Sequence, residues 1–319
     1  MATIRWGMIG CGDVTEIKSG PGFRKATDST LVAVSRRNGA LAEDYARRHG
    51  VPRWHTDPDE IVNAPDIDAV YIATWPDSHP EYALRCAAAG KPTLVEKPMA
   101  GTPDECARMN EAFTQAGVPL WVAFYRRALP RLIKVRELLD DGAVGPVRAV
   151  RSTLVAPLAP PGKVPPAADP ALSRGLFADQ LCHTLDLYDW FFGPVEHAHG
   201  LAANTTGRYA TPDTVTATFR LGSGVLGSGV WCHAGQTPYE VNEVIGAAGR
   251  LLFATFTDSP IQLVRPGGTE TVHVADPPHV HQPLIQTIVD ELNGAGSCPS
   301  TGITAARTAW VCDQILADW

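Results

Sequence analysis

The sequence lacks the features that would assign it to a membrane or secreted class. No apolar run approaches the roughly 18 residues that a membrane-spanning helix needs, and the N-terminus shows no signal-peptide pattern. The seven cysteines are odd in number and include no Cys-x-x-Cys pair, which suits thiols in a reducing compartment better than a disulfide framework. We therefore expect a cytoplasmic protein with no membrane partner.

An excess of basic charge is also missing. The net charge of -7 argues against nucleic acid or an anionic membrane as a main partner. The pairs Cys182-His183 and Cys232-His233 do not predict zinc, because adjacent residues rarely bind the same ion. No metal site is expected. The 319 residues do provide enough length for two domains, each with its own core.

The first half of the chain alternates short apolar, β-rich runs with helical segments. Strands are predicted at 4–9, 30–34, 68–73, 93–96 and 120–124. This alternation predicts an α/β fold with a parallel, doubly wound sheet. It stops after Phe124, so we expect a dinucleotide-binding domain over 1–124 and a substrate-binding and oligomerisation domain over 125–319.

A glycine-rich turn follows the first strand directly. Its sequence, Gly10-Cys11-Gly12-Asp13-Val14-Thr15, matches the dinucleotide fingerprint in the first two glycines and has Thr15 at the third position. The first glycine permits a tight turn, and the second lets the backbone approach a pyrophosphate. The helix that follows should be short, because Gly20-Pro21-Gly22 interrupts it.

The second strand ends at Ser35-Arg36-Arg37, where NAD-selective proteins usually place an acid for the ribose hydroxyls. Two guanidinium groups stand there instead, and they suit the 2'-phosphate of NADP. NADP is therefore the predicted cofactor, with NAD as the alternative. Two exposed arginines in a surface loop are the competing explanation.

Lys97 lies just past the carboxyl end of the predicted strand at 93–96, where open α/β sheets bind ligands. Pro98 fixes its own φ and biases Lys97 away from helix, so the amine is presented from a stiff corner. A lysine at a strand end is otherwise a solvated charge. Trp75, at the end of another strand, could lie against a nicotinamide or merely cover the site.

A polar triplet marks the second half. Between Ala178 and Tyr188 the apolar residues follow helical spacing on one face, and Asp179, His183 and Asp186 lie at i, i+4 and i+7 on the opposite face. An acid one turn before a histidine can fix its tautomer. The six prolines of 157–170 predict a loop that either covers the substrate or is a stiff surface excursion. Short strands are predicted beyond Pro194, at 214–220, 224–231, 239–245, 250–256 and 261–264, and they favour a mixed or antiparallel sheet.

These motifs together resemble a known family. Gly10-x-Gly12, Ala73-Thr74 and Glu96-Lys97-Pro98 resemble the glucose–fructose oxidoreductase/inositol dehydrogenase family, Gfo/Idh/MocA. Asp179-x-x-x-His183 is similar to its second motif, although Leu181 replaces a common glycine. The resemblance implies an N-terminal Rossmann domain and a C-terminal α+β domain whose large open mixed or antiparallel sheet pairs subunits into a homodimer or homotetramer.

The resemblance also implies that Lys97, Asp179 and His183 converge beside the nicotinamide. We expect an oxidoreductase that transfers hydride between nicotinamide C4 and a secondary alcohol or ketone of a sugar, polyol or related cyclic substrate. His183 would act as acid/base, Asp179 would orient it, and Lys97 would polarise the substrate oxygen. A non-catalytic dinucleotide or sugar sensor, and an NAD-assisted lyase or glycosidase, stay open as alternatives.

The remaining candidate residues fall into two groups. The expected cofactor contacts are Gly10, Cys11, Gly12, Asp13, Val14, Ser35, Arg36, Arg37, Thr74, Trp75, His79, Glu96 and Lys97. The expected substrate contacts are Tyr125, Arg126 and Trp231, and for Trp231, as for His279 and His281, packing is the commoner role.

Overall fold

A computed structural model describes residues 1–158, 175–208 and 210–319. Residue contacts divide the chain into two compact units. The first contains Met1–Leu129 and Pro277–Ala306, and the second contains Pro130–Asp276 and Arg307–Trp319. The domains 1–124 and 125–319 stay a prediction. The units differ from them chiefly because residues 277–306 pack with the N-terminal part. Most of the proline-rich segment 157–170 lies outside the described residues.

The first unit is built on a six-stranded, wholly parallel sheet in the order β3-β2-β1-β4-β5-β6. The strands β4, β5 and β6 are buried along their whole length, as a sheet with helices on both faces requires. The doubly wound parallel sheet is thus confirmed. The strands are β1 (Ile4–Ile9), β2 (Ser29–Ser35), β3 (Arg53–His55), β4 (Ala69–Ile72), β5 (Thr93–Val95) and β6 (Leu120–Val122).

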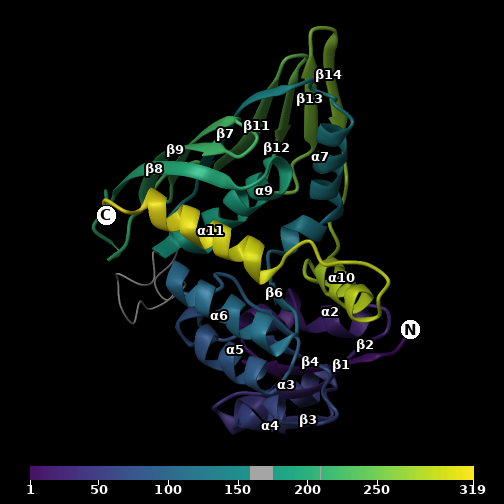
Figure 1. The fold of residues 1–319 in the computed structure, drawn as a ribbon. Coiled ribbons are helices and arrows are strands. Elements are labelled where there is room, and N and C mark those ends of the chain that lie inside the picture. The colour runs from purple at the N-terminus through teal and green to yellow at the C-terminus, as the bar shows by residue number, and fades with distance from the viewer. Residues whose placement is uncertain (159–174, 209) are drawn as a thin grey trace. The chain divides into compact units, whose positions relative to one another are not determined.

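Helices flank this sheet on two sides, with α5 and α6 together on one side and α2 with α10 on the other (Figure 1). The helix after the glycine turn is short, as predicted: α1 ends at Ile17, and Gly20-Pro21-Gly22 begins a separate helix, α2, because proline is tolerated in the first turn. The helices are α1 (Asp13–Ile17), α2 (Gly20–Lys25), α3 (Gly39–His49), α4 (Asp59–Val62), η1 (Pro76–Ser78), α5 (His79–Ala88), α6 (Pro103–Ala116), η2 (Tyr125–Ala128) and α10 (Gln282–Leu292).

The second unit contains an eight-stranded sheet in the order β14-β13-β12-β11-β7-β10-β9-β8. Among the strands that the structure describes here, β7 and β10 pair in parallel and the other neighbours pair antiparallel, so the predicted mixed sheet is confirmed. Along β9 and β10 buried and exposed residues alternate, so one face is packed and the other is open. The strands are β7 (Val147–Val155), β8 (Val195–Ala203), β9 (Thr214–Leu221), β10 (Leu226–Cys232), β11 (Tyr239–Gly246), β12 (Arg250–Phe253), β13 (Ile261–Arg265) and β14 (Gly268–Val272).

Aromatic packing against the sheet fixes α9 (Cys182–Phe192) in the core of this unit. The rings of Tyr188 and Phe219 are 5.9 Å apart, and those of Phe191 and Phe253 are 5.8 Å apart. This unit also contains α7 (Pro130–Asp140) and the π-helical turn η3 (Phe177–Leu181), whereas α11 (Gly302–Ile315) belongs to the first unit up to Ala306 and to the second from Arg307. Among the described helices, none combines the length and apolar character that a membrane span requires.

Candidate active site

The carboxyl ends of four strands in the first unit lie in register. Ile9 of β1 pairs with Ser35 of β2 and with Ile72 of β4, and Ile72 pairs with Val95 of β5. The backbone ladder continues one residue further, with N–H to O distances of 2.8–2.9 Å from Gly10 to Ser35, from Ala73 to Ile9 and from Glu96 to Ile72. The loops that carry the predicted site residues therefore begin side by side. The strand order reverses between β1 and β4, which is where such folds bind ligands.

The glycine turn has the geometry that its sequence predicts. Gly10 adopts φ +92°, and a Cβ there would lie 2.8 Å from the Ala73 carbonyl, so only glycine fits. A Cβ on Gly12 would meet nothing within 4 Å, which leaves its backbone open to a ligand. Thr15, at the third position, donates its hydroxyl to the Gly12 carbonyl at 2.7 Å and closes the turn. Burial raises the pKa of the Cys11 thiol to about 11, so only the backbone of this residue is available to a cofactor.

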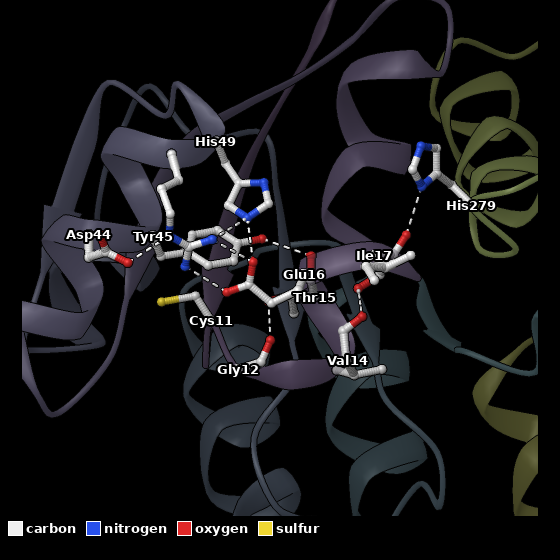
Figure 2. A network of polar contacts seen from close by, with 12 residues as sticks. Cys11, Gly12, Val14, Thr15, Glu16, Ile17, Asp44, Tyr45, His49 and His279 are labelled. Atoms are coloured by element: carbon white, nitrogen blue, oxygen red, sulfur yellow. Dashed lines mark hydrogen bonds and ion pairs between the residues drawn. The ribbon is translucent and has the colours of Figure 1, made fainter.

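A polar network fastens the helix after this turn to α3, and Figure 2 shows it with the Glu16 carboxylate facing His49. Arg48 donates to both carboxylate oxygens of Glu16 at 2.7 Å, and this pairing, outweighing burial, lowers the Glu16 pKa to about 2. Tyr45 donates to the Thr15 carbonyl at 3.0 Å. The helix α3 therefore stabilises the segment that follows the glycine turn.

Arg36 lies directly against the glycine turn. Its Nη1 atom donates to the Cys11 carbonyl oxygen at 2.9 Å. Arg36 is half-buried and Arg37 is exposed, whereas Ser35 is buried and offers only its backbone to this region. A guanidinium, and no acid, therefore stands at the end of β2. Asp13 is exposed and Val14 is half-buried at the start of α1.

His79 joins two of the strand-end loops. Its Nδ1 atom lies 3.0 Å from the Pro98 carbonyl oxygen, and its Nε2 atom lies 3.1 Å from the Thr74 carbonyl oxygen. The ring is fully buried, and burial lowers its pKa despite the two carbonyls. His79, which was predicted to contact the cofactor, is thus buried and connects the Thr74 and Pro98 loops. Trp75, in the same loop, is 56% exposed.

Lys97 follows β5 at the predicted corner and is half-buried, and the Lys97–Pro98 peptide bond is cis. The neighbouring Glu96 differs from expectation. It was expected among the cofactor contacts, but its side chain is buried and accepts a 2.5 Å hydrogen bond from the Tyr71 hydroxyl. Its second oxygen accepts the Lys97 backbone N–H at 3.2 Å. Burial raises the pKa of this carboxyl.

The two other members of the expected triad lie in the second unit, where the local helix differs from the prediction. Asp179 is in the π-helical turn η3, and His183 is in the first turn of α9. The two residues therefore lie in turns of different repeat, because a π-turn contains one more residue than an α-helical turn. His183 and Asp186 are both buried. The His183 ring meets Phe256 edge-on at 6.2 Å.

A hydrogen-bonded chain fixes α9 beside this histidine. Thr184 and Thr255 share a 2.9 Å hydrogen bond, Asn242 donates to Thr255 at 3.0 Å, and Tyr188 donates to Asn242 at 3.0 Å. The Glu240 carboxylate accepts the backbone N–H groups of residues 255–257 at 2.5–3.1 Å. This loop therefore holds Phe256 against His183.

His233 is a residue of this region that the sequence did not single out for catalysis. It is buried after β10, and burial lowers its pKa although the charge of Asp179 opposes that shift. Within the described residues its Nε2 atom has no hydrogen-bond partner. Only its neighbour Asp179 could have drawn attention to it, and that proximity is not visible in the sequence.

The three expected substrate contacts have different surroundings. In the first unit, Tyr125 stacks on His281 with ring centroids 4.3 Å apart, and the Arg126 guanidinium lies 4.7 Å above the Tyr125 ring. In the second unit, Trp231 is fully buried and donates to Ser152 at 3.0 Å, as a core residue does. Across residues 1–158, 175–208 and 210–319, no cluster of three or more His, Cys, Asp or Glu could hold a metal ion.

Two family models match the chain. One, for an oxidoreductase family with an NAD-binding Rossmann fold, matches residues 4–124. The other, for the GFO/IDH/MocA C-terminal domain, matches residues 132–252. Together they cover most of both units.

Proteins that are similar to most of the chain are also named as oxidoreductases or dehydrogenases. The chain is 36% identical over 315 residues to Oxidoreductase P35 of Formosa agariphila, covering 97% of each protein. It is 28% identical over 268 residues to myo-inositol 2-dehydrogenase of Thermotoga maritima, covering 82% of this chain and 78% of that protein. The structure of levoglucosan dehydrogenase with NADH and levoglucosan has a TM-score of 0.85 at 22% identity, covering 98% of this chain and 96% of that one.

Proposed function

Because the chain belongs to the Gfo/Idh/MocA oxidoreductase family, we propose that it is an NADP-preferring dehydrogenase or reductase. Its substrate is a secondary alcohol or ketone of a sugar, polyol or related cyclic compound. The observation that carries the proposal is the register of the strand ends, which sets the Lys97 corner, the Thr74 loop and the glycine turn along one edge of the sheet. An amine beside a dinucleotide site is the arrangement that carbonyl polarisation requires.

The first unit supplies groups that fit a dinucleotide. The open backbone at Gly12 permits close approach of a pyrophosphate. Arg36 and Arg37 stand where the adenosine ribose lies in this fold, and a guanidinium fork suits a 2'-phosphate better than a hydroxyl pair. When bound, the nicotinamide accepts or gives the hydride. Preference for NADP over NAD rests on these two arginines.

The acid/base role is assigned to His183, with Asp179 as its electrostatic partner, and the polarising role to Lys97. His183 is buried and held by α9, so its ring is preorganised. In alcohol oxidation His183 takes the hydroxyl proton, while the Lys97 ammonium stabilises the charge that develops on the oxygen. In carbonyl reduction the same groups act in reverse.

The substrate class and the assembly are inferred from relatives and surface. Myo-inositol and levoglucosan, named for two of the similar proteins, both carry secondary alcohols on rings. The open face of the second sheet exposes Leu201 and Val230, which flank Thr216 in one row, and Leu226 on the same face of β10. Such a face suits self-association into a homodimer or homotetramer. The seven thiols suit the cytoplasm.

The test is a spectrophotometric screen at about 340 nm, where reduced nicotinamide absorbs. Polyols, cyclic sugars and their keto forms are offered with NADP and with NAD. The proposal expects net NADPH formation or consumption with at least one ring alcohol or its ketone. Turnover of a sugar without any net change in absorbance, with cofactor retained through purification, would instead identify a lyase or glycosidase. Ligand binding without turnover would identify a sensor.

A further inference from the structure

A buried acid–imidazole pair lies behind Lys97, and the roles assigned above do not use it. His281 is 1% exposed, and its Nδ1 atom lies 3.5 Å from Oε1 of Glu96. Within the described residues this Nδ1 atom makes no hydrogen bond. A polar atom that is buried without a partner is costly, so an atom in this state next to a carboxyl group calls for an explanation.

His281 is held in this place by the segment that returns to the first unit. Its backbone N–H donates to the Lys18 carbonyl at 3.2 Å, and its own carbonyl accepts from Ile285 in α10. The ring stacks on Tyr125 with centroids 4.3 Å apart and planes 29° apart. The backbone and the stack together fix which atom faces Glu96.

Two donors bond to the Glu96 carboxyl group, which solvent hardly reaches, and the His281 ring lies close to it. Tyr71 donates to Oε1 at 2.5 Å, the Lys97 backbone N–H donates to Oε2 at 3.2 Å, and His281 faces Oε1. Burial favours the neutral acid and raises the Glu96 pKa. Hydrogen bonds from donors favour the carboxylate. The charge on Glu96 therefore depends on how many donors it keeps.

Burial, followed by the cations around the pair, favours the neutral form of the imidazole. Burial, together with nearby cations, lowers the His281 pKa to about 3. A neutral ring carries one N–H, on either nitrogen. With the proton on Nδ1, the ring donates toward Glu96; with the proton on Nε2, a lone pair would face the carboxylate. The titratable and charged groups around the pair are Lys18, Tyr71, Lys97, Tyr125 and Arg126.

We propose that His281 is a positioning residue: its neutral Nδ1–H holds Glu96 as a carboxylate, and that negative charge keeps Lys97 in the ammonium form that polarises the substrate oxygen. The proposal rests on the role given above to Lys97. It assigns catalytic importance to the last quarter of the chain, through a residue that need not touch substrate or cofactor.

Two substitutions at the same position separate this role from simple packing. His281→Phe keeps an aromatic ring on Tyr125 but removes the N–H. His281→Gln loses the ring but keeps an N–H donor. With His281→Phe, the alkaline limb of the kcat/KM profile should move to lower pH by about one unit, because Glu96 becomes neutral and Lys97 loses its counter-charge. His281→Gln should restore most of that shift.

Two further experiments test the proposal, and the first of them does not depend on the folding of His281→Phe. Tyr71→Phe removes a different donor from the same carboxyl, and should shift the alkaline limb in the same direction. In a Glu96→Gln background, His281→Phe should give no additional shift, because no carboxylate remains to be held. The proposal would be overturned if the alkaline limb of the kcat/KM profile fell at the same pH in the wild-type protein and in His281→Phe. It would also be overturned if His281→Phe and His281→Gln shifted that limb equally.

A readout that needs no substrate separates this proposal from the proposed function. Nitrogen-15 NMR of labelled histidine reports which ring nitrogen carries the proton, and the His281 signal is assigned by its loss in His281→Phe. The expected result is a neutral ring protonated at Nδ1 near pH 7. A proton on Nε2 would contradict the inference even if dehydrogenase activity is found. Absence of activity with an Nδ1–H signal would count against the proposed function alone.

Discussion

The Arg36 guanidinium donates a 2.9 Å hydrogen bond to the carbonyl oxygen of Cys11. This contact joins the end of β2 to the glycine turn after β1, which are the two places where a Rossmann fold recognises a dinucleotide. One side chain therefore both supports the turn and brings positive charge to the ribose end of the site.

Arg36→Asp should weaken NADP binding by about 10-fold to 100-fold, which corresponds to one lost charge-assisted hydrogen bond. NAD binding should hold or improve, because the new carboxylate can accept from the ribose hydroxyls. Fluorescence titration with both cofactors measures the two affinities. Arg47→Ala, at an exposed arginine of α3 outside the predicted cofactor contacts, is the matched control for a loss of positive charge. Equal losses for both cofactors would mean that Arg36 acts only by supporting the glycine turn.

Lys97→Ala and His183→Ala should each lower turnover by about 10² to 10⁴, the usual contribution of a placed acid–base group. Cofactor affinity should change little, because neither side chain forms the glycine turn. Steady-state kinetics with the best substrate of the screen, together with cofactor titration, measures both effects. Wild-type turnover in both variants would remove the assignment of these residues.

Glu240→Gln should lower turnover without changing cofactor affinity. The carboxylate accepts three backbone N–H groups of the loop that presents Phe256 to His183. Loss of charge-assisted acceptors of this kind costs about 1–3 kcal/mol of stability. Thermal unfolding and kcat are the measurements, and Glu270→Gln on exposed β14 is the control. A kcat that matches the wild-type value would show that the loop does not position His183.

Asp213 should contribute acid-sensitive stability. It is fully buried, and although burial alone would raise its pKa, hydrogen bonds from the backbone and hydroxyl groups of Thr205 and Thr206 lower it to about 2. Because the Asp213 pKa is lower in the folded than in the unfolded state, its ionised carboxylate stabilises the folded protein at pH values above the unfolded pKa near 3.8. This stabilisation is lost as the pH falls toward 2.

The corresponding variant is Asp213→Asn. At neutral pH it should lose at least about 2 kcal/mol of unfolding free energy, the equivalent of the pKa difference. The difference in unfolding free energy between the variant and the wild-type protein should become smaller as the pH falls from about 4 to about 2. Urea unfolding at several pH values measures it. A gap that stays constant with pH would mean that Asp213 is not charged in the folded protein.

The first unit could be predicted in most of its parts because its signals are local. Glycine and proline flank the parallel strands, and Lys97 follows a run of four buried residues, 93–96. The surroundings of Glu96 could not be predicted from this run. Because all three residues of β5 are buried, there is no alternation of buried and exposed residues to show toward which face the Glu96 side chain points. Its partners Tyr71 and His281 are far away in sequence.

The second unit was harder to predict at the site itself. Helical periodicity assumes one constant repeat, and the π-helical turn at Phe177–Leu181 breaks that assumption just before His183. Polar residues of α9 are buried because distant partners satisfy them, as Arg307 does for Asp189 with two 2.7 Å hydrogen bonds. The strand β8 was missed because its sequence, Val195–Ala203, is rich in alanine and polar residues.

The return of residues 277–306 has a consequence for the order in which the chain becomes native. Trp121 forms a β-bridge with Thr301, Asn110 bonds to Gly302, and Asn293 bonds to the backbone of Ala2, all within the first unit. During synthesis β1 leaves the ribosome first, but the first unit cannot complete its packing until α10, near the end of the chain, has been made. An early stop near residue 276 would therefore release a nucleotide-binding half that lacks part of its own core.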